Sequence, residues 1–171
     1  MTPSIEYRTV DKSEWGPGPW QDEPDKMQWA DPATGLPCLI VRGPVGALCG
    51  YVGVAPDHPA HGKNYDHWSY GADGEPSALE PIEEAINGLQ AHGGLTFAGA
   101  CGHGDDPARG ICHIPGDGEP DTVWWFGFDC AHCGDLSPDM GRRRRDEGVY
   151  RDLAYVRDQV AALAAQLAAL A

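Results

Sequence analysis

The sequence predicts an α+β domain, in which a small, mostly antiparallel sheet carries a long C-terminal helix packed on it. The chain of 171 residues contains 23 Gly and 15 Pro, which break it into short apolar runs typical of strands and turns. Residues 122–129 alternate as a strand does, and apolar residues near the C-terminus recur at helical spacing. A chain of this length can bury a core without the help of disulfides.

The strands follow from short apolar runs between turn residues. We expect them at residues 38–42, 47–54, 95–99 and 122–129. The first two form a hairpin, because Gly43-Pro44 separates them. In the last strand successive side chains face opposite sides, with Trp124, Phe126 and Phe128 on one face and Val123, Trp125 and Gly127 on the other.

Two helices are predicted. The first covers residues 79–91, where apolar residues recur at helical spacing and glutamates stand near the start. The second runs from about Val149 to Leu170, with an apolar stripe formed by Leu153, Val156, Val160, Leu163, Leu167 and Leu170. This stripe either packs on the sheet or forms the contact of a homodimer. It is too short for an independent coiled coil.

The strands and helices divide the chain into three parts. Residues 1–37 show no periodicity and carry three tryptophans, so we expect an irregular arm whose indoles cover the domain surface. Residues 38–141 form the α+β core. Residues 142–171 form an arginine-rich linker and the C-terminal amphipathic helix.

The net charge of −14 disfavours generic nucleic-acid binding, because an acidic surface repels phosphate backbones. The block Arg142-Arg143-Arg144-Arg145 is the local exception. It is interpreted as a solvated linker in preference to an anion or partner contact. A host protein that binds the acidic surface or the C-terminal helix is one hypothesis for a partner.

The N-terminus has neither the basic nor the apolar region of a secretory signal, and no apolar stretch is long enough for a membrane span. We therefore predict a cytoplasmic protein without membrane contact. The six cysteines are then expected to be reduced. They are left for metal ligation, catalysis or burial.

Zinc is the first interpretation of the cysteines. Two thiols in the pattern Cys130-x-x-Cys133 can bind one ion, and Cys101 with Cys112, or His103 with His113, could complete the four ligands. Only half of a paired CxxC pattern exists, and buried free cysteine is the alternative. The predicted metal ligands are Cys101, Cys112, His113, Cys130, His132 and Cys133.

A hydrolase is the second interpretation. Cys130 at the end of a strand could act as the nucleophile, with His92 as the base and Asp129 as the group that orients it. His58 and His113 are alternative bases, and Asp135 is an alternative orienting group. No cysteine-protease signature surrounds Cys130.

A mixed histidine and carboxylate site that activates a metal-bound water is also open, built from His58, His61, His92, His132, Asp66 and Asp135. The HExxH pattern and the phosphate-binding glycine loops are absent. The long polar loop at 55–66 suits a small polar ligand, and nearby aromatic residues could wall its pocket. The predicted ligand-binding residues are His58, Lys63, Tyr65, Asp66 and Asp135.

The chain resembles a family of uncharacterised small proteins from actinobacteria and their phages. The resemblance covers roughly residues 34–139 and is carried by Thr34 to Cys38, Cys49 to Val54, His58-Pro59, Gly62-Lys63, Tyr65-Asp66, His92 to Phe97 and Trp124 to Asp135. No activity is established for that family, so the resemblance implies a phage-type intracellular setting. It further implies that Cys133 varies among relatives, which favours His58, His92, Asp129, Cys130, His132 and Asp135 as the shared set.

The leading hypothesis is therefore a cytoplasmic phage-type accessory protein with a Cys/His/Asp site that binds a metal, expected to be zinc. The ion would be structural or would serve a small polar ligand. The alternatives are a hydrolase and a non-enzymatic protein that binds a host partner.

Overall fold

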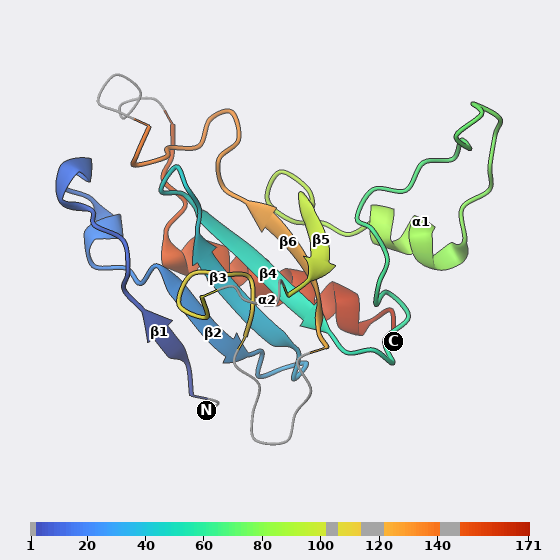
Figure 1. Cartoon of the computed structure of the whole chain (residues 1–171), viewed down its shortest axis with the longest axis horizontal. Helices are drawn as coiled ribbons and strands as arrows, with labels where there is room; N and C mark the ends of the chain where they lie inside the picture. The colour runs from blue at the N-terminus through green and yellow to red at the C-terminus, as the bar shows by residue number, and fades with distance from the viewer. Residues whose placement is uncertain (1–2, 102–105, 114–121, 141–147) are drawn as a thin grey trace.

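A six-stranded antiparallel sheet forms the centre of the molecule (Figure 1). The computed structural model describes residues 3–101, 106–113, 122–140 and 148–171. The strand order is β1-β2-β3-β4-β6-β5, and every neighbouring pair is antiparallel. The strands are β1 (Ile5–Tyr7), β2 (Lys26–Ala30), β3 (Pro37–Arg42), β4 (Leu48–Val54), β5 (Phe97–Ala100) and β6 (Trp124–Asp129). The predicted α+β class is confirmed.

One face of the sheet is covered by the C-terminal helix α2 (Leu153–Ala168), which lies across β3 and β4 (Figure 1). Asp152 begins the helix, because its side chain accepts a hydrogen bond from the backbone N–H of Tyr155. The inward stripe is fully buried at Val156, Val160, Leu163 and Leu167. The chain's own sheet therefore occupies this stripe, and a homodimer through α2 would have to use the opposite side of the helix.

The two faces of β6 separate as the alternation predicts. Phe126 and Phe128 join the core cluster under α2. Val123 and Trp125 join a smaller cluster on the other face, together with Leu39 of β3. Burying large aromatic residues on both faces of β6 fixes this strand in the middle of the domain, so the turn that follows it starts from a rigid support.

The prediction of an irregular arm over residues 1–37 is wrong for two segments. β1 and β2 extend the sheet, and Ala30 of β2 pairs with Pro37 of β3 across the expected domain boundary. The apolar pattern of β2 is interrupted by Lys26, which is buried on the face opposite α2 although lysine is rarely buried. The tryptophans Trp15, Trp20 and Trp29 are buried as expected.

The other elements lie where the sequence places them, with shifted ends. The short helix α1 (Pro81–Asn87) is half as long as predicted, because a Glu80–Glu83 capping box with Pro81 starts it and Gly88 ends it. The predicted arginine block at 142–145 and His103 lie outside the described residues.

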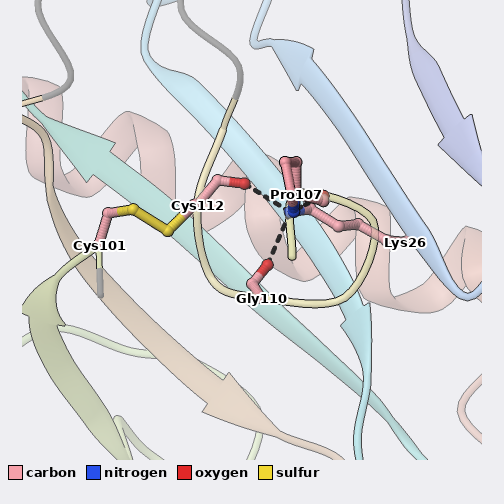
Figure 2. Close-up of a disulfide and its surroundings, with 5 residues drawn as sticks. All are labelled: Lys26, Cys101, Pro107, Gly110 and Cys112. Carbon is pink, nitrogen blue, oxygen red and sulfur yellow. Dashed lines mark hydrogen bonds between the residues drawn. A yellow bond between two sulfur atoms is a disulfide. The ribbon is translucent and has the colours of Figure 1, made fainter. Parts of the chain in front are cut away.

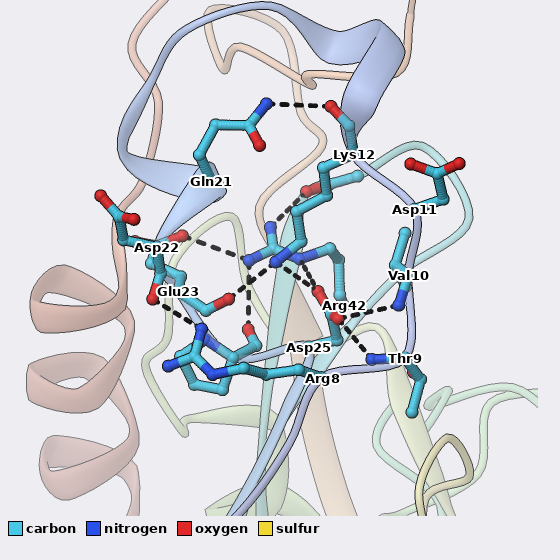
Figure 3. A network of polar contacts seen from close by, with 12 residues as sticks. Arg8, Thr9, Val10, Asp11, Lys12, Gln21, Asp22, Glu23, Asp25 and Arg42 are labelled. Carbon is cyan, nitrogen blue, oxygen red and sulfur yellow. Dashed lines mark hydrogen bonds and ion pairs between the residues drawn. The ribbon is translucent and has the colours of Figure 1, made fainter.

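A buried polar network gathers side chains of the N-terminal segment around Arg42 of β3 (Figure 3). It extends to the start of α2 through Glu23. The Arg42 guanidinium donates to Asp25 Oδ1 at 2.8 Å and to Glu23 Oε2 at 3.2 Å. The other oxygen of Glu23 accepts the backbone N–H of Leu153 at 2.8 Å. Since Leu153 is the first residue of α2, this network holds the start of the helix beside the N-terminal segment.

Candidate metal centre

Three side chains from two distant parts of the chain converge beside the end of β6. Their ligand atoms lie within 4.8 Å of one another in the group His92, His132 and Asp135. His92 lies in the turn before β5, whereas the other two belong to the turn that follows β6. Pairing of β5 with β6 brings these two turns together.

Asp135 is the centre of this cluster, and only 2% of its side chain is exposed. Its Oδ2 accepts hydrogen bonds from His92 Nε2 at 2.6 Å and from the backbone N–H of His132 at 3.1 Å. Its Oδ1 accepts one from Arg151 Nε at 2.9 Å. Burial alone raises the pKa of Asp135, but the bonds from His92, Arg151 and His132 outweigh it, so the pKa is lowered. The carboxyl is therefore ionised at neutral pH.

His92 is held from both sides. Its Nε2 donates to the ionised Asp135, so in the neutral ring Nδ1 accepts the hydroxyl of Tyr155, 2.8 Å away. The Arg151 guanidinium lies 4.9 Å from the centre of the Tyr155 ring. Arg151 and Tyr155 were not predicted as site residues, because nothing in the spacing of the C-terminal helix distinguishes them from surface positions.

His132 packs its ring against the backbone of Gly93. A Cβ at Gly93 would lie 2.4 Å from His132 Cε1, and Gly93 has a φ of +69°. The Nδ1 atom of His132 lies 3.6 Å from Asp129 Oδ1 and 3.8 Å from Asp135 Oδ2. It is buried and has no hydrogen-bond partner among the described residues. An unsatisfied buried nitrogen of this kind is uncommon and leaves room for a water or an ion as its partner.

A cavity of about 590 Å³ adjoins the cluster. His132 and Asp135 form part of its wall, and the remaining lining residues are Ala131, Cys133, Gly134, Ser137, Met140 and Gly148. Its volume falls within the range of small-molecule pockets. The cluster thus has access to a space that a small polar ligand could fill.

Cys130 does not fit the predicted role of a nucleophile. Its side chain is buried, and burial together with the negative charge of Asp135 raises the pKa of its thiol to about 12. Asp129 does not orient His92, since Asp135 does so. Cys133 is exposed on the cavity wall. Among the described residues no cysteine belongs to a group that could hold a metal.

Cys101 and Cys112 form a disulfide, so the prediction of reduced thiols is wrong for this pair. Neither sulfur is available to zinc in this state, because a metal needs the thiolate. His113 packs edge-on against Trp125 on the face of the sheet opposite α2, with ring centres 5.5 Å apart. The predicted six-residue zinc set therefore does not assemble, and His132 alone remains at the centre.

The predicted ligand-binding residues lie in several separate places. His58 accepts the N–H of Ala60 at Nδ1, and its Nε2 donates to the carbonyl of Leu167 at the end of α2. Lys63 pairs with Glu80 at 2.9 Å. Tyr65 and Asp66 line a separate cavity of about 440 Å³ next to α1. Of the five residues, only Asp135 reaches the centre.

Comparison of the chain with protein-family models, with curated proteins and with solved structures finds no significant match. The resemblance to small actinobacterial and phage proteins thus stays a prediction. No helix in the described part of the chain has the length and apolar character needed to cross a membrane.

Proposed function

We propose that the protein binds a divalent transition metal, with zinc as the preferred ion, through His92, His132 and Asp135. Two imidazoles and one carboxylate are a ligand set that zinc accepts, and three protein ligands leave a position open for water or a substrate. The adjoining cavity would give a small polar ligand access to that position. This keeps the predicted metal and replaces the predicted thiols by imidazole and carboxylate groups.

The observation that carries the proposal is the buried His132 Nδ1, which has no hydrogen-bond partner among the described residues. It lies 3.8 Å from Asp135 Oδ2, and His92 Nε2 lies 2.6 Å from the same oxygen. A metal ion at His92 Nε2 would require the ring proton to move to Nδ1, which would then donate to the Tyr155 hydroxyl. Protonation of a ligating imidazole competes with the ion, so binding should weaken as the pH falls. Asp129, 3.6 Å from His132 Nδ1, adds a negative charge beside the site.

The surroundings of the three ligands support the same role. Tyr155 orients His92 through Nδ1, as the hydrogen-bond partners of metal-bound histidines usually do. Arg151 binds Oδ1 of Asp135 and leaves Oδ2 directed at the two histidines. Its positive charge lowers the affinity for a cation, which favours a metal that is shared with an anionic or polar ligand over a purely structural one.

Hydrolysis by a metal-bound water is the second candidate, because the cavity adjoins two of the three ligands. Catalysis by Cys130 is not proposed. A phage-type cytoplasmic setting remains part of the proposal, and in such a reducing compartment the Cys101–Cys112 disulfide would be open to reduction.

The test is metal binding by protein purified without an affinity tag. We expect about one equivalent of zinc in the wild type and in His61→Ala, a control that removes a histidine outside the cluster. His132→Ala should weaken binding by at least about tenfold in calorimetry while circular dichroism shows a native fold. Less than about a tenth of an equivalent in the wild type, or equal affinity in His132→Ala, would contradict the proposal.

Hydrolysis is tested separately with the zinc-loaded protein. The substrates are small phosphate and carboxylate esters, and the reaction should depend on added zinc and be lost in His132→Ala. Turnover that persists in His132→Ala would show that the hydrolysis takes place at another site.

A further inference from the structure

Lys26 is a fully buried lysine on the face of the sheet opposite α2. Its β2 neighbours Met27 and Trp29 belong to the core under the helix, whereas Lys26 pairs in register with Val41, which belongs to the cluster on the other face. Its ammonium group donates to the backbone carbonyls of Pro107, Gly110 and Cys112 (Figure 2). The nitrogen lies 2.6 Å from the first two oxygens.

All three carbonyls come from one short segment, residues 107–112, which we name the lysine loop. It lies on the side of the sheet away from α2 (Figure 1). A disulfide joins Cys112, the last residue of this loop, to Cys101, the residue after β5 (Figure 2). In the sheet, β5 and β2 are separated by β6, β4 and β3. The disulfide thus anchors the loop at the β5 edge of the sheet, and Lys26 holds it near the opposite edge.

The lysine loop both buries the Lys26 ammonium group and supplies its three hydrogen-bond acceptors. A buried ammonium group without acceptors is strongly unfavourable, so Lys26 must enter water once the three carbonyls move away. Three carbonyls can meet one nitrogen only while the loop keeps its conformation. Loop opening and hydration of Lys26 are therefore one event, which gives the segment two states.

The disulfide favours the closed state. It closes a loop across a sequence separation of 11 residues, and such a cross-link removes much of the conformational freedom of the segment inside it. Two further contacts of the lysine loop with the body involve little burial. Ile111 is only partly buried against the second cluster, and the bond of 3.3 Å from Arg109 to the Thr9 carbonyl is exposed.

We propose that the Cys101–Cys112 disulfide is a redox-sensitive latch that keeps the lysine loop closed over Lys26. Reduction breaks the sulfur–sulfur bond with two electrons from a dithiol, which becomes a disulfide while its two hydrogens pass to the sulfurs of Cys101 and Cys112. The released loop then opens and exposes the Lys26 ammonium group beside the apolar cluster of Tyr51 and Trp125. On a protein with a net charge of −14, this creates a local cationic and apolar surface that the oxidised form hides.

The test is lysine acetylation of the full chain, read by peptide mass spectrometry, with and without a phosphine reductant. The chain has three lysines, which makes each one a separate probe. Lys63, with 32% of its side chain exposed, should react in both states and normalises the reagent. Lys12, with 7% exposed in the polar network of Figure 3, reports unfolding of the domain. Lys26 should react on the order of tenfold faster after reduction, while Lys12 stays protected.

Two variants separate the latch from other effects of the reductant. The double variant Cys101→Ser with Cys112→Ser should expose Lys26 without any reductant. Cys133→Ser, which removes an exposed free thiol, should leave Lys26 protected until reductant is added. Unchanged protection of Lys26 in the double variant overturns the proposal. So does a rise in Lys12 labelling that matches the rise at Lys26, because it would show unfolding of the whole domain.

Discussion

His92 Nε2 lies 2.6 Å from Oδ2 of Asp135, although 43 residues separate them in the chain. This contact makes Asp135, and not the neighbouring Asp129, the partner of His92. It also places an ionised carboxylate in a position where only 2% of the side chain is exposed. The stability of the domain should depend on that charge.

Substituting Asp135 by Asn should lower the free energy of unfolding by about 1–3 kcal/mol at pH 7, because Arg151 and His92 lose a charged acceptor. The pKa of Asp135 is lowered in the folded protein, since the bonds from His92 and Arg151 outweigh burial. A carboxyl with a lowered folded-state pKa stabilises the fold above its unfolded pKa of about 3.9, and the contribution is lost as the pH falls through the folded value.

The difference between wild type and Asp135→Asn should therefore be largest near neutral pH and should shrink below about pH 4. Urea denaturation over a pH series measures it. Asp57→Asn, at an exposed loop position, is the control and should leave the curve unchanged. A difference that does not vary with pH would show that Asp135 acts through its shape and not through its charge.

Thiol reactivity should distinguish the free cysteines. Burial raises the pKa of Cys38 and Cys130 to about 12 and that of Cys49 to about 11. Cys133 is exposed. In the native protein at about pH 8 we expect an aromatic disulfide reagent to modify Cys133 quickly and the other three only on unfolding. Rapid labelling of Cys130 would restore it as a candidate nucleophile.

Gly93→Ala should damage the metal centre. A Cβ at Gly93 would meet the His132 ring at 2.4 Å, and the φ of +69° is unfavourable for alanine. Gly94→Ala is a matched control, since Gly94 has a φ of +87° with open space around a Cβ. Both variants should lose about 1–2 kcal/mol of stability from the backbone, but only Gly93→Ala should also weaken zinc binding. Equal zinc affinity in the two variants would show that His132 is not a ligand.

His58→Ala should destabilise the end of α2. The His58 ring joins the N–H of Ala60 to the carbonyl of Leu167, which also accepts the backbone N–H of Leu170 at the end of the helix. We expect a loss of about 1–2 kcal/mol in the free energy of unfolding, with zinc binding unchanged. His61→Ala, whose ring meets the exposed carbonyl of Thr122, should cost less than about 0.5 kcal/mol. Loss of zinc binding in His58→Ala would return His58 to the site.

Patterns within one element predicted the parts of the fold that they govern. The alternation from Trp124 to Phe128 assigned each aromatic residue to its face, and the stripe from Val156 to Leu167 identified the buried side of α2. Both rest on the fixed geometry of a strand or a helix, which repeats every two or every 3.6 residues. The same reasoning did not predict β2, because its buried Lys26 is polar.

The sequence predicted the kinds of residue in the candidate site better than it predicted which residues form it. His92, His132 and Asp135 were all among the candidates, but the cysteines grouped with them lie elsewhere. Cys101 pairs with Cys112, and Cys130 is buried. Adjacency in sequence suggested one Cys/His cluster, whereas the turn after β6 directs His132 and Asp135 toward His92 and leaves the side chain of Cys130 in the core.

The sequence by itself determined the α+β class, the buried faces of β6 and α2, and the kinds of side chain available for a metal, because apolar periodicity and composition are properties of short segments. Only the tertiary structure decided that His92 meets Asp135, that Cys101 meets Cys112, and that three carbonyls cover Lys26. Such pairings depend on which strands become neighbours, and that order follows from the packing of the whole sheet against α2 and not from any local pattern.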